Sequence, residues 1–216
     1  MSGILYGVGL GPGDPDLITV KSSRLISQAR VIAYPSLAGG ESFARSIAAD
    51  LISPDAEEIV MDVPMTVERA PAQAAYDIGA KNIAAVLDRG EDVVCLCEGD
   101  PFFYGSFMYL YARLVADYPV EVVPGVTSIT TCAARAGMPL AARNERLTVL
   151  PGPLPAEELR ARIEGAESVA SMKVGRHLSK IRAVIADLGL TDKAAYIERA
   201  SLPDELVCPL AQAPET

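Results

Sequence analysis

Short apolar runs alternate with helical hydrophobic periodicity along most of the chain. The pattern predicts strands at 3–8, 30–34, 57–61, 92–97 and 120–123. It predicts helices between them at 17–29, 42–52, 69–89 and 104–117. A repeated order of strand and helix is typical of a mostly parallel sheet with helices on both faces. We therefore expect an N-terminal doubly wound α/β domain.

The remainder of the chain predicts a second, smaller α/β domain with a mixed sheet. A short helix at 127–137 is followed by Met138, Pro139 and the segment 141–144, which indicate the crossing into this domain. The pattern beyond it predicts strands at 146–150, 167–174 and 193–199, and helices at 155–164 and 176–188. The tail 203–216 has no clear periodicity and is expected to be irregular or frayed. We expect domains at 1–140 and 141–216, with a ligand cleft between them.

Composition limits the class of protein. Half of the residues are hydrophobic and 22% are charged, which suffices for a globular core. No apolar run approaches the roughly 18 residues that a membrane span needs. The first residues lead into a strand-like segment without a basic region before it, so no targeting segment is predicted. We expect a soluble protein in the cytoplasm, with no membrane partner.

Charge and cysteine usage exclude two further classes. A formal net charge of −9 opposes binding to nucleic acid, so the expected partner is a small molecule. If that molecule is a polyanion, local arginines must hold it. Cys95 and Cys97 lie on the same face of a strand and are interpreted as core residues. His177 is the single histidine and is interpreted as a surface residue, so no metal site is expected.

The first strand leads into a glycine-rich turn at 7–14, GVGLGPGD, ahead of a helix. Such a turn often binds phosphate, but Pro12 or Asp14 falls where a dinucleotide motif needs its third small residue. Pro12 also lacks an N–H, and Asp14 and Asp16 would repel a pyrophosphate. The second strand ends in Tyr34 and Pro35, without a carboxylate for a ribose. The turn is either a tight turn with Asp16 as a helix cap or a close approach to another kind of ligand.

The turns after the fourth and fifth strands are also candidates for a ligand site. The segment 98–105, EGDPFFYG, offers two carboxylates, three aromatic rings and glycines at a strand's carboxyl end. This combination suits a cation with an apolar body, although a helix entry with Asp100 as cap is the alternative. After the fifth strand, Thr127 or Ser128 is an N-cap candidate that could also bind a ligand. No motif of a hydrolase is present.

The segments 7–19, 98–101 and 124–128 resemble, in order and spacing, the tetrapyrrole (corrin/porphyrin) methylases. The segments 31–35, 141–147 and 172–176 resemble the branch of that family that methylates C20 of precorrin-2 in cobalamin biosynthesis. The resemblance implies S-adenosylmethionine as methyl donor, S-adenosylhomocysteine as product and a homodimer. It implies cofactor contacts from nine residues, which are Pro12, Glu98, Gly99, Asp100, Phe103, Thr127, Ser128, Met172 and Ala200.

The implied substrate is precorrin-2 or its cobalt form, which carries many carboxylates. We expect Arg143, Arg146 and Arg176 to pair with them, unless these side chains are simply solvated. No catalytic base is assigned, because family members that methylate uroporphyrinogen carry an aspartate where this chain has Pro35. The family's closing strand is also not found beyond Thr216, so the second sheet is shortened or the chain was trimmed.

Several other functions stay open from the sequence. Within the family, methylation of another ring position or synthesis of diphthine is possible. An oxidoreductase of the NAD type is the alternative from another enzyme class, and a nucleotide-sensing module is the alternative without catalysis. The missing third glycine and the missing ribose carboxylate speak against the oxidoreductase.

Overall fold

The structure is a computed structural model that describes residues 2–37, 40–64 and 69–215. The chain forms two compact units, Met1–Thr127 and Ser128–Thr216. The domain limits inferred from the sequence, 1–140 and 141–216, stay a prediction, as does a ligand cleft between the domains.

The first unit is built on a five-stranded parallel sheet. Its strands are β1 (Leu5–Gly9), β2 (Val31–Leu37), β3 (Glu57–Val63), β4 (Val93–Cys97) and β5 (Val120–Val123). The strand order is β3-β2-β4-β1-β5, and every neighbouring pair is parallel. The doubly wound α/β architecture predicted from the alternating pattern is therefore confirmed.

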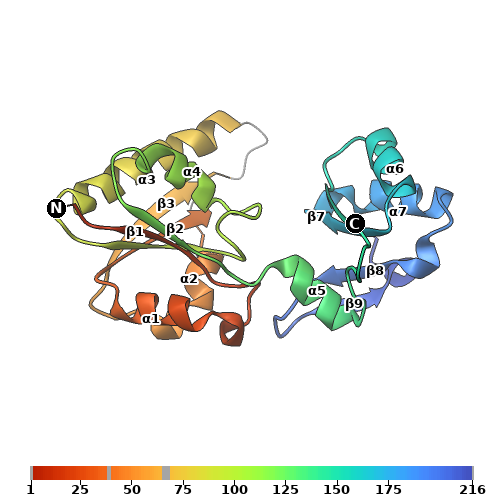
Figure 1. The fold of residues 1–216 in the computed structure, drawn as a ribbon, viewed down its shortest axis with the longest axis horizontal. Helices are drawn as coiled ribbons and strands as arrows, with labels where there is room; N and C mark the ends of the chain where they lie inside the picture. Colours follow the sequence, from red (N-terminus) through yellow and green to blue (C-terminus); the bar gives the residue numbers. More distant parts are fainter. Residues whose placement is uncertain (1, 38–39, 65–68, 216) are drawn as a thin grey trace. The chain divides into compact units, whose positions relative to one another are not determined.

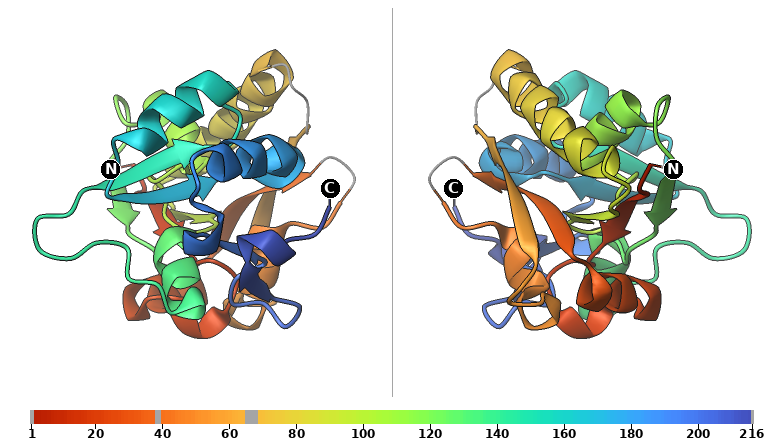
Figure 2. Two further views of the ribbon diagram at one scale, coloured as in Figure 1. Left: turned by 90° about the vertical axis from the view of Figure 1, so that its right-hand side faces the viewer. Right: turned by 90° about the vertical axis from the view of Figure 1, so that its left-hand side faces the viewer.

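Helices cover both faces of this sheet. They are α1 (Val20–Gln28), α2 (Phe43–Ile47), α3 (Arg69–Leu87) and α4 (Phe107–Leu114). Figure 1 and the right-hand view of Figure 2 show α1 and α2 on one face and α3 and α4 on the other. Side chains of β4 pack into the cores on both faces of the sheet. Cys95 and Cys97 pack with α3 and α4, and Val94 and Leu96 pack with α1 and α2. Both cysteines are buried free thiols, and burial raises the pKa of each.

The strand order determines where a ligand site can form. Strand β1 continues through α1, whereas its neighbour β4 continues through α4 on the opposite face. The two chain segments therefore leave the sheet in opposite directions at their carboxyl ends. Such a switch point leaves a crevice that open α/β sheets use for ligands. The turns after β1 and β4 meet at this point.

Local hydrogen bonds set the start of α1. The sequence predicted a helix at 17–29, but residues Pro15–Leu17 form a separate 3-10 turn capped by the Asp14 side chain. Helix α1 begins at Val20 because the Thr19 hydroxyl accepts a hydrogen bond from Ser22 N at 3.2 Å. Asp16 therefore does not cap this helix.

The second unit contains a parallel and an antiparallel strand pair. Strands β6 (Leu147–Pro151) and β7 (Ser168–Met172) are parallel, and β8 (Ala195–Glu198) and β9 (Leu206–Pro209) are antiparallel. Its helices are α5 (Ser128–Ala136), α6 (Ala156–Glu164) and α7 (Leu178–Asp187). Helices α6 and α7 share a core with β6 and β7, while α5 packs against β8 and β9 (Figure 2).

The prediction of an irregular tail at 203–216 was wrong for part of this segment. Residues 206–209 form β9, and Leu210–Gln212 form a 3-10 turn whose Leu210 is buried. A four-residue strand that ends in Pro209 is too short to give a clear alternating pattern. Its hydrogen-bonding partner β8 supplies the order that the local sequence does not reveal.

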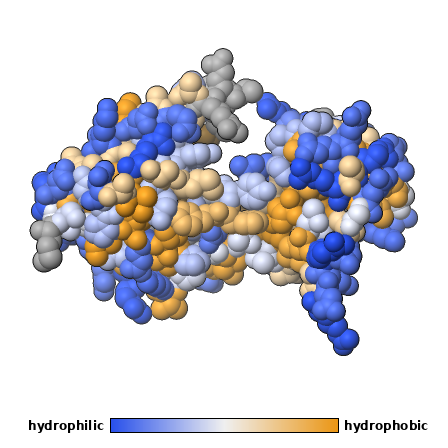
Figure 3. Space-filling view, turned by 45° about the horizontal axis from the view of Figure 1, so that its top comes forward, coloured by the Kyte–Doolittle hydropathy of each residue, from blue (hydrophilic) through white to orange (hydrophobic). Residues whose placement is uncertain are grey.

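Apolar side chains also reach the surface. Figure 3 shows hydrophobic patches among hydrophilic side chains on the face that it draws. Phe102, Phe103 and Tyr104, in the turn after β4, are among the exposed hydrophobic residues. Within the described residues, no helix is long and apolar enough to cross a membrane.

Candidate functional site

The turns after β1 and β4 are joined by their backbones. Gly11 N donates to Gly99 O at 3.2 Å, and Gly99 N donates to Gly11 O at 2.8 Å. Leu10 N also donates to Cys97 O at 2.9 Å. The bond from Leu10 to Cys97 extends the parallel pairing of β1 with β4, whereas Gly11 and Gly99 form an isolated antiparallel bridge between the two turns. The glycine-rich turn predicted as a ligand loop is therefore held against the turn that carries Glu98 and Asp100.

The turn after β5 packs against the other two through glycines. A Cβ on Gly9 would lie 2.5 Å from the Gly125 nitrogen, and a Cβ on Gly125 would lie 2.0 Å from the Gly99 oxygen. Both distances are too short for a real contact, so only glycine lets the three backbones meet here. Gly99 differs, because its φ is +63° and a Cβ there would find nothing within 4 Å. One side of Gly99 therefore faces open space.

Asp100 fastens two of these turns together. Its Oδ1 accepts from Phe102 N at 2.9 Å and from Phe103 N at 3.0 Å, and its Oδ2 accepts from Gly125 N at 3.0 Å. The carboxylate therefore links the turn after β4 to the turn after β5. Helix α4 begins later, at Phe107, so the alternative in which Asp100 caps a helix is wrong. Its direct contact with a cofactor stays a prediction.

The Glu98 carboxylate accepts no hydrogen bond from any other described side chain or backbone group, unlike that of Asp100. Its residue is exposed, yet desolvation by the surrounding protein raises the pKa of its carboxyl. Phe103 lies in the same turn with 37% of its surface exposed, and its ring meets Tyr104 edge-on with centroids 5.2 Å apart. Pro12 follows Gly11 and is half-buried. An unengaged carboxylate beside aromatic rings suits a cation that has an apolar body.

The remaining predicted cofactor residues lie at the end of the first unit and in the second unit. Thr127 ends the first unit, and Ser128 is the first residue of α5. Met172 is the last residue of β7, and Ala200 follows β8 with 9% of its surface exposed. Residues next to Met172 and Ala200 have left-handed backbones, with φ 56° at Lys173, 49° at Arg199 and 70° at Ser201. Such strain in non-glycine residues often marks functional turns.

The three arginines predicted to bind substrate differ in their environment. Arg146 pairs with Glu167, with Nε 3.1 Å from Oε2, and its backbone N donates to the same oxygen at 2.7 Å. Arg143 and Arg176 are exposed and form no ion pair with another described residue. The structure therefore leaves Arg143 and Arg176 available for a ligand anion, whereas Arg146 already has a partner.

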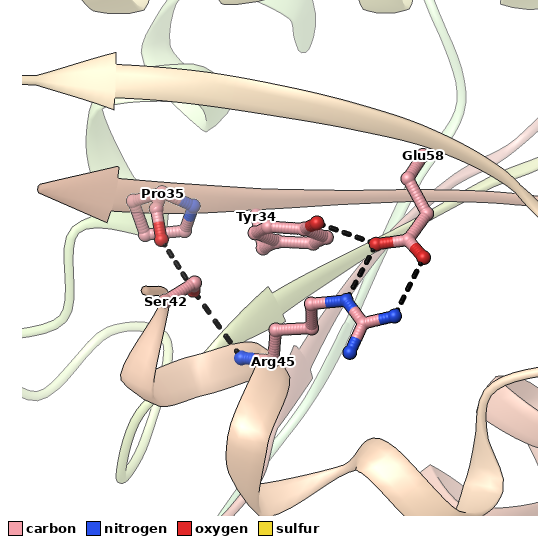
Figure 4. Close-up of polar contacts among 5 residues, drawn as sticks. All are labelled: Tyr34, Pro35, Ser42, Arg45 and Glu58. Carbon is pink, nitrogen blue, oxygen red and sulfur yellow. Dashed lines mark hydrogen bonds and ion pairs between the residues drawn. The ribbon is translucent and has the colours of Figure 1, made fainter. Parts of the chain in front are cut away.

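The carboxyl end of β2 carries a polar network around Tyr34 and Pro35 (Figure 4). Arg45 holds Glu58 through two hydrogen bonds, from Nε at 2.7 Å and from Nη2 at 2.8 Å. The Tyr34 hydroxyl donates to the same carboxylate. Ser42 caps α2 and donates to Pro35 O at 2.6 Å, so the network fixes the backbone at Pro35. Pro35 itself has no side chain that can transfer a proton.

The side chains of His177 and of the four cysteines form none of the hydrogen bonds described above. His177 is half-buried at the start of α7, where desolvation and then Lys180 and Arg176 lower its pKa. No group of three or more histidine, cysteine, aspartate or glutamate residues among the described positions could hold a metal ion.

Sequence reasoning did not single out two side chains that shape the second unit. Glu205 accepts hydrogen bonds from Ser201 N and from Arg135 Nε, although the three residues come from a turn and a distant helix. No spacing in the sequence signals this contact, because 70 positions separate Arg135 from Glu205.

We predict that Gly125→Ala lowers the free energy of unfolding by about 1–3 kcal/mol, because its methyl group would overlap the Gly99 carbonyl. Gly165→Ala is the control, since Gly165 has φ −97° and open space around its Cβ position. The control should change stability by no more than about 0.5 kcal/mol. Urea unfolding followed by circular dichroism measures both, and equal effects would contradict the close packing of the turns.

We also predict that Glu58 stabilises the first unit in a pH-dependent way. Hydrogen bonds from Arg45, and then from Tyr34, lower the pKa of Glu58 from 4.5 to about 2. A lowered carboxyl pKa contributes stability above the unfolded value, and this contribution disappears as the pH falls from 4.5 towards 2. The stability difference between wild type and Glu58→Gln should shrink over that window. Urea unfolding across the range tests this, and a constant difference would refute it.

Known proteins resemble this chain over nearly its whole length. The profile of a family described as tetrapyrrole (corrin/porphyrin) methylases matches residues 4–214. A precorrin-2 C(20)-methyltransferase of Sinorhizobium sp is 41% identical, over 98% of this chain and 91% of that protein. A cobalt-precorrin-2 C(20)-methyltransferase of Salmonella typhimurium is 33% identical, over 95% of this chain and 87% of that protein.

A solved structure has the same fold. It is a uroporphyrin-III C-methyl transferase from Thermus thermophilus complexed with S-adenyl homocysteine. Its TM-score to this chain is 0.66 at 27% identity, with 97% of this chain and 85% of that chain covered. The profile match and the two relatives cover nearly the whole chain, so the chain belongs to the tetrapyrrole (corrin/porphyrin) methylases.

Proposed function

We propose that this protein is an S-adenosylmethionine-dependent methyltransferase that methylates C20 of precorrin-2, giving precorrin-3A in cobalamin biosynthesis. The observation that carries this proposal is the 41% identity to a precorrin-2 C(20)-methyltransferase over nearly the whole of both chains. We propose that it acts in the cytoplasm as a homodimer. The cobalt form of precorrin-2 is the second candidate substrate, supported by the 33% identical relative that is named for it.

The turns after β1, β4 and β5 support a sulfonium cofactor rather than a dinucleotide. Glu98 offers an unengaged carboxylate, Phe103 an exposed aromatic ring and Gly99 an open backbone edge. A carboxylate can accept hydrogen bonds from an ammonium group or from ribose hydroxyls, and an aromatic face favours an onium group. The named ligand of the Thermus thermophilus relative is the demethylated product of such a cofactor. These residues therefore fit S-adenosylmethionine.

The protein's own contribution to the reaction is mainly positioning. S-adenosylmethionine, when bound, supplies an electrophilic methyl group on a cationic sulfur. The accepting carbon of precorrin-2 is itself a nucleophile, so alignment can provide most of the rate enhancement. Asp100 links the turns after β4 and β5, and the missing side chains of Gly9 and Gly125 allow the backbones of these turns to approach closely. Pro35 cannot accept a proton, so no base is assigned at the end of β2.

We predict that Glu98→Gln weakens binding of S-adenosylhomocysteine about tenfold, because a charged hydrogen-bond acceptor is lost. Isothermal titration calorimetry measures this, with NADH as the ligand of the competing oxidoreductase hypothesis. Wild-type binding of S-adenosylhomocysteine without binding of NADH supports the methyltransferase, and the reverse result would refute it.

Because the pKa of Glu98 is raised, wild-type affinity for S-adenosylhomocysteine should fall with decreasing pH through that raised pKa, and Glu98→Gln should lack this decrease.

We further predict that Arg143→Ala and Arg176→Ala each raise the KM for the tetrapyrrole without changing the affinity for S-adenosylhomocysteine. Both side chains are exposed cations without an ion pair among the described residues, and an acidic protein needs such groups to hold a polycarboxylate. Mass spectrometry of the product from precorrin-2 and from its cobalt form measures turnover and identifies the preferred acceptor. Unchanged KM values in both variants would show that these arginines do not bind substrate.

A further inference from the structure

The turn between β8 and β9 is strained and is braced by its own side chains. It spans residues 199–205 and includes two left-handed residues, Arg199 and Ser201, on either side of the buried Ala200. Such a conformation is unfavourable for a non-glycine residue and persists only where surrounding contacts maintain it. Within the turn, Arg199 Nε donates to Asp204 O at 3.1 Å and pairs with Asp204 Oδ2 at 2.7 Å. These bonds hold the base of the turn.

Glu205 supplies the contact that holds the tip of the turn. Its Oε2 accepts from Ser201 N at 2.6 Å, so it engages the backbone of one left-handed residue directly. The same carboxylate accepts from Arg135 Nε, at 2.7 Å to Oε1 and 2.9 Å to Oε2. Only 10% of the Glu205 side chain is exposed, which limits competition from water. The Ser201 N–H, and then Arg135, lower the pKa of Glu205, which keeps the carboxylate ionised.

Arg135 connects this turn to α5. It lies in the last turn of α5, the helix that begins at Ser128, and a cation is favourable at that end of a helix. Helix α5 also packs against β8 and β9. Strands β8 and β9 have four residues each, and so short a two-stranded pair is marginal without further packing. The carboxylate of Glu205 therefore fixes the turn both internally and against α5.

We infer that Glu205 is a positioning residue for cofactor binding, which holds the strained turn around Ala200 onto α5. The inference rests on the proposed function and on the expectation from the sequence that Ala200 and Ser128 contact S-adenosylmethionine. The structure gives an independent reason to assign a role to this turn. The strained residues Arg199 and Ser201 lie on either side of the buried Ala200, just after β8. Glu205 itself acts through the backbone of Ser201 and does not need to touch the cofactor.

The test compares Glu205→Ala with a matched control, Glu167→Ala. Glu167 is also a glutamate of the second unit that accepts from a backbone N–H and from an arginine side chain, both of Arg146. Both of these hydrogen bonds come from Arg146, outside the turn at 199–205, and calorimetry with S-adenosylhomocysteine alone does not involve the tetrapyrrole. Glu205→Ala should weaken S-adenosylhomocysteine binding about tenfold, and Glu167→Ala should leave it unchanged. Thermal unfolding of both variants measures the accompanying loss of stability.

Steady-state kinetics separates positioning from a general loss of structure. Glu205→Ala should raise the KM for S-adenosylmethionine by about tenfold while kcat stays within about twofold of wild type. Glu205→Gln should give an intermediate affinity, because its amide oxygen can still accept from Ser201 N but no longer pairs with Arg135. Arg135→Ala should also give an intermediate affinity, since it removes the link to α5 alone.

The outcomes distinguish this inference from the proposed function. If wild type does not bind S-adenosylhomocysteine, the proposed function fails and the inference fails with it. If wild type binds and Glu205→Ala binds equally well, the inference alone is overturned. If Glu205→Ala does not fold, the test uses Glu205→Gln and Arg135→Ala instead. The inference is overturned if both of these variants bind S-adenosylhomocysteine as tightly as wild type does. A loss of affinity in Glu167→Ala equal to that in Glu205→Ala also overturns it.

Discussion

Direct contact between backbones at the carboxyl ends of β1, β4 and β5 is the constraint on which the first unit's candidate site depends. A parallel sheet brings these ends to one edge, but side chains would normally keep the following turns apart. Here Gly9 and Gly125 remove that obstacle, and an antiparallel bridge between Gly11 and Gly99 joins the turns after β1 and β4. The resulting surface presents the Gly99 backbone and the Glu98 carboxylate without intervening bulk. A ligand can then meet main-chain atoms that a larger residue would cover.

Four carboxylates among the described residues differ in whether the protein engages them by hydrogen bonds. Asp100, Glu58 and Glu205 each accept several hydrogen bonds from the protein and thereby fix turns and helix positions. Glu98 is not engaged in this way, and its raised pKa reflects a desolvated position without a cation beside it. A positively charged ligand group would supply the missing partner. Among the described residues, the structure thus distinguishes carboxylates that brace turns and helices from Glu98, whose carboxylate accepts no hydrogen bond from them.

The architecture was largely predictable because its signals are local. All five strands of the first unit and its four main helices follow from apolar runs and helical periodicity, with ends shifted by a few residues. The shifts have identifiable causes, such as Thr19 capping α1 after a separate turn at Pro15–Leu17. Strand β9 was missed because its order comes from pairing with β8. Propensity over four residues that end in proline is too weak to reveal it.

The sequence proposed members for the candidate site, and that membership stays a prediction, whereas the contacts among these residues came only from the fold. The sequence by itself determined the parallel α/β class, the glycine turns at strand ends and the family resemblance, because these depend on residue type and spacing. Only the tertiary structure decided that the Asp100 oxygens accept from Phe102, Phe103 and Gly125. It likewise decided that Arg146 has an ion pair, whereas Arg143 and Arg176 pair with no other described residue. The hydrogen bond from Arg135 to Glu205 was also visible only in the tertiary structure. Hydrogen bonds between distant positions depend on where the folded backbone places two side chains, and no local pattern encodes that distance.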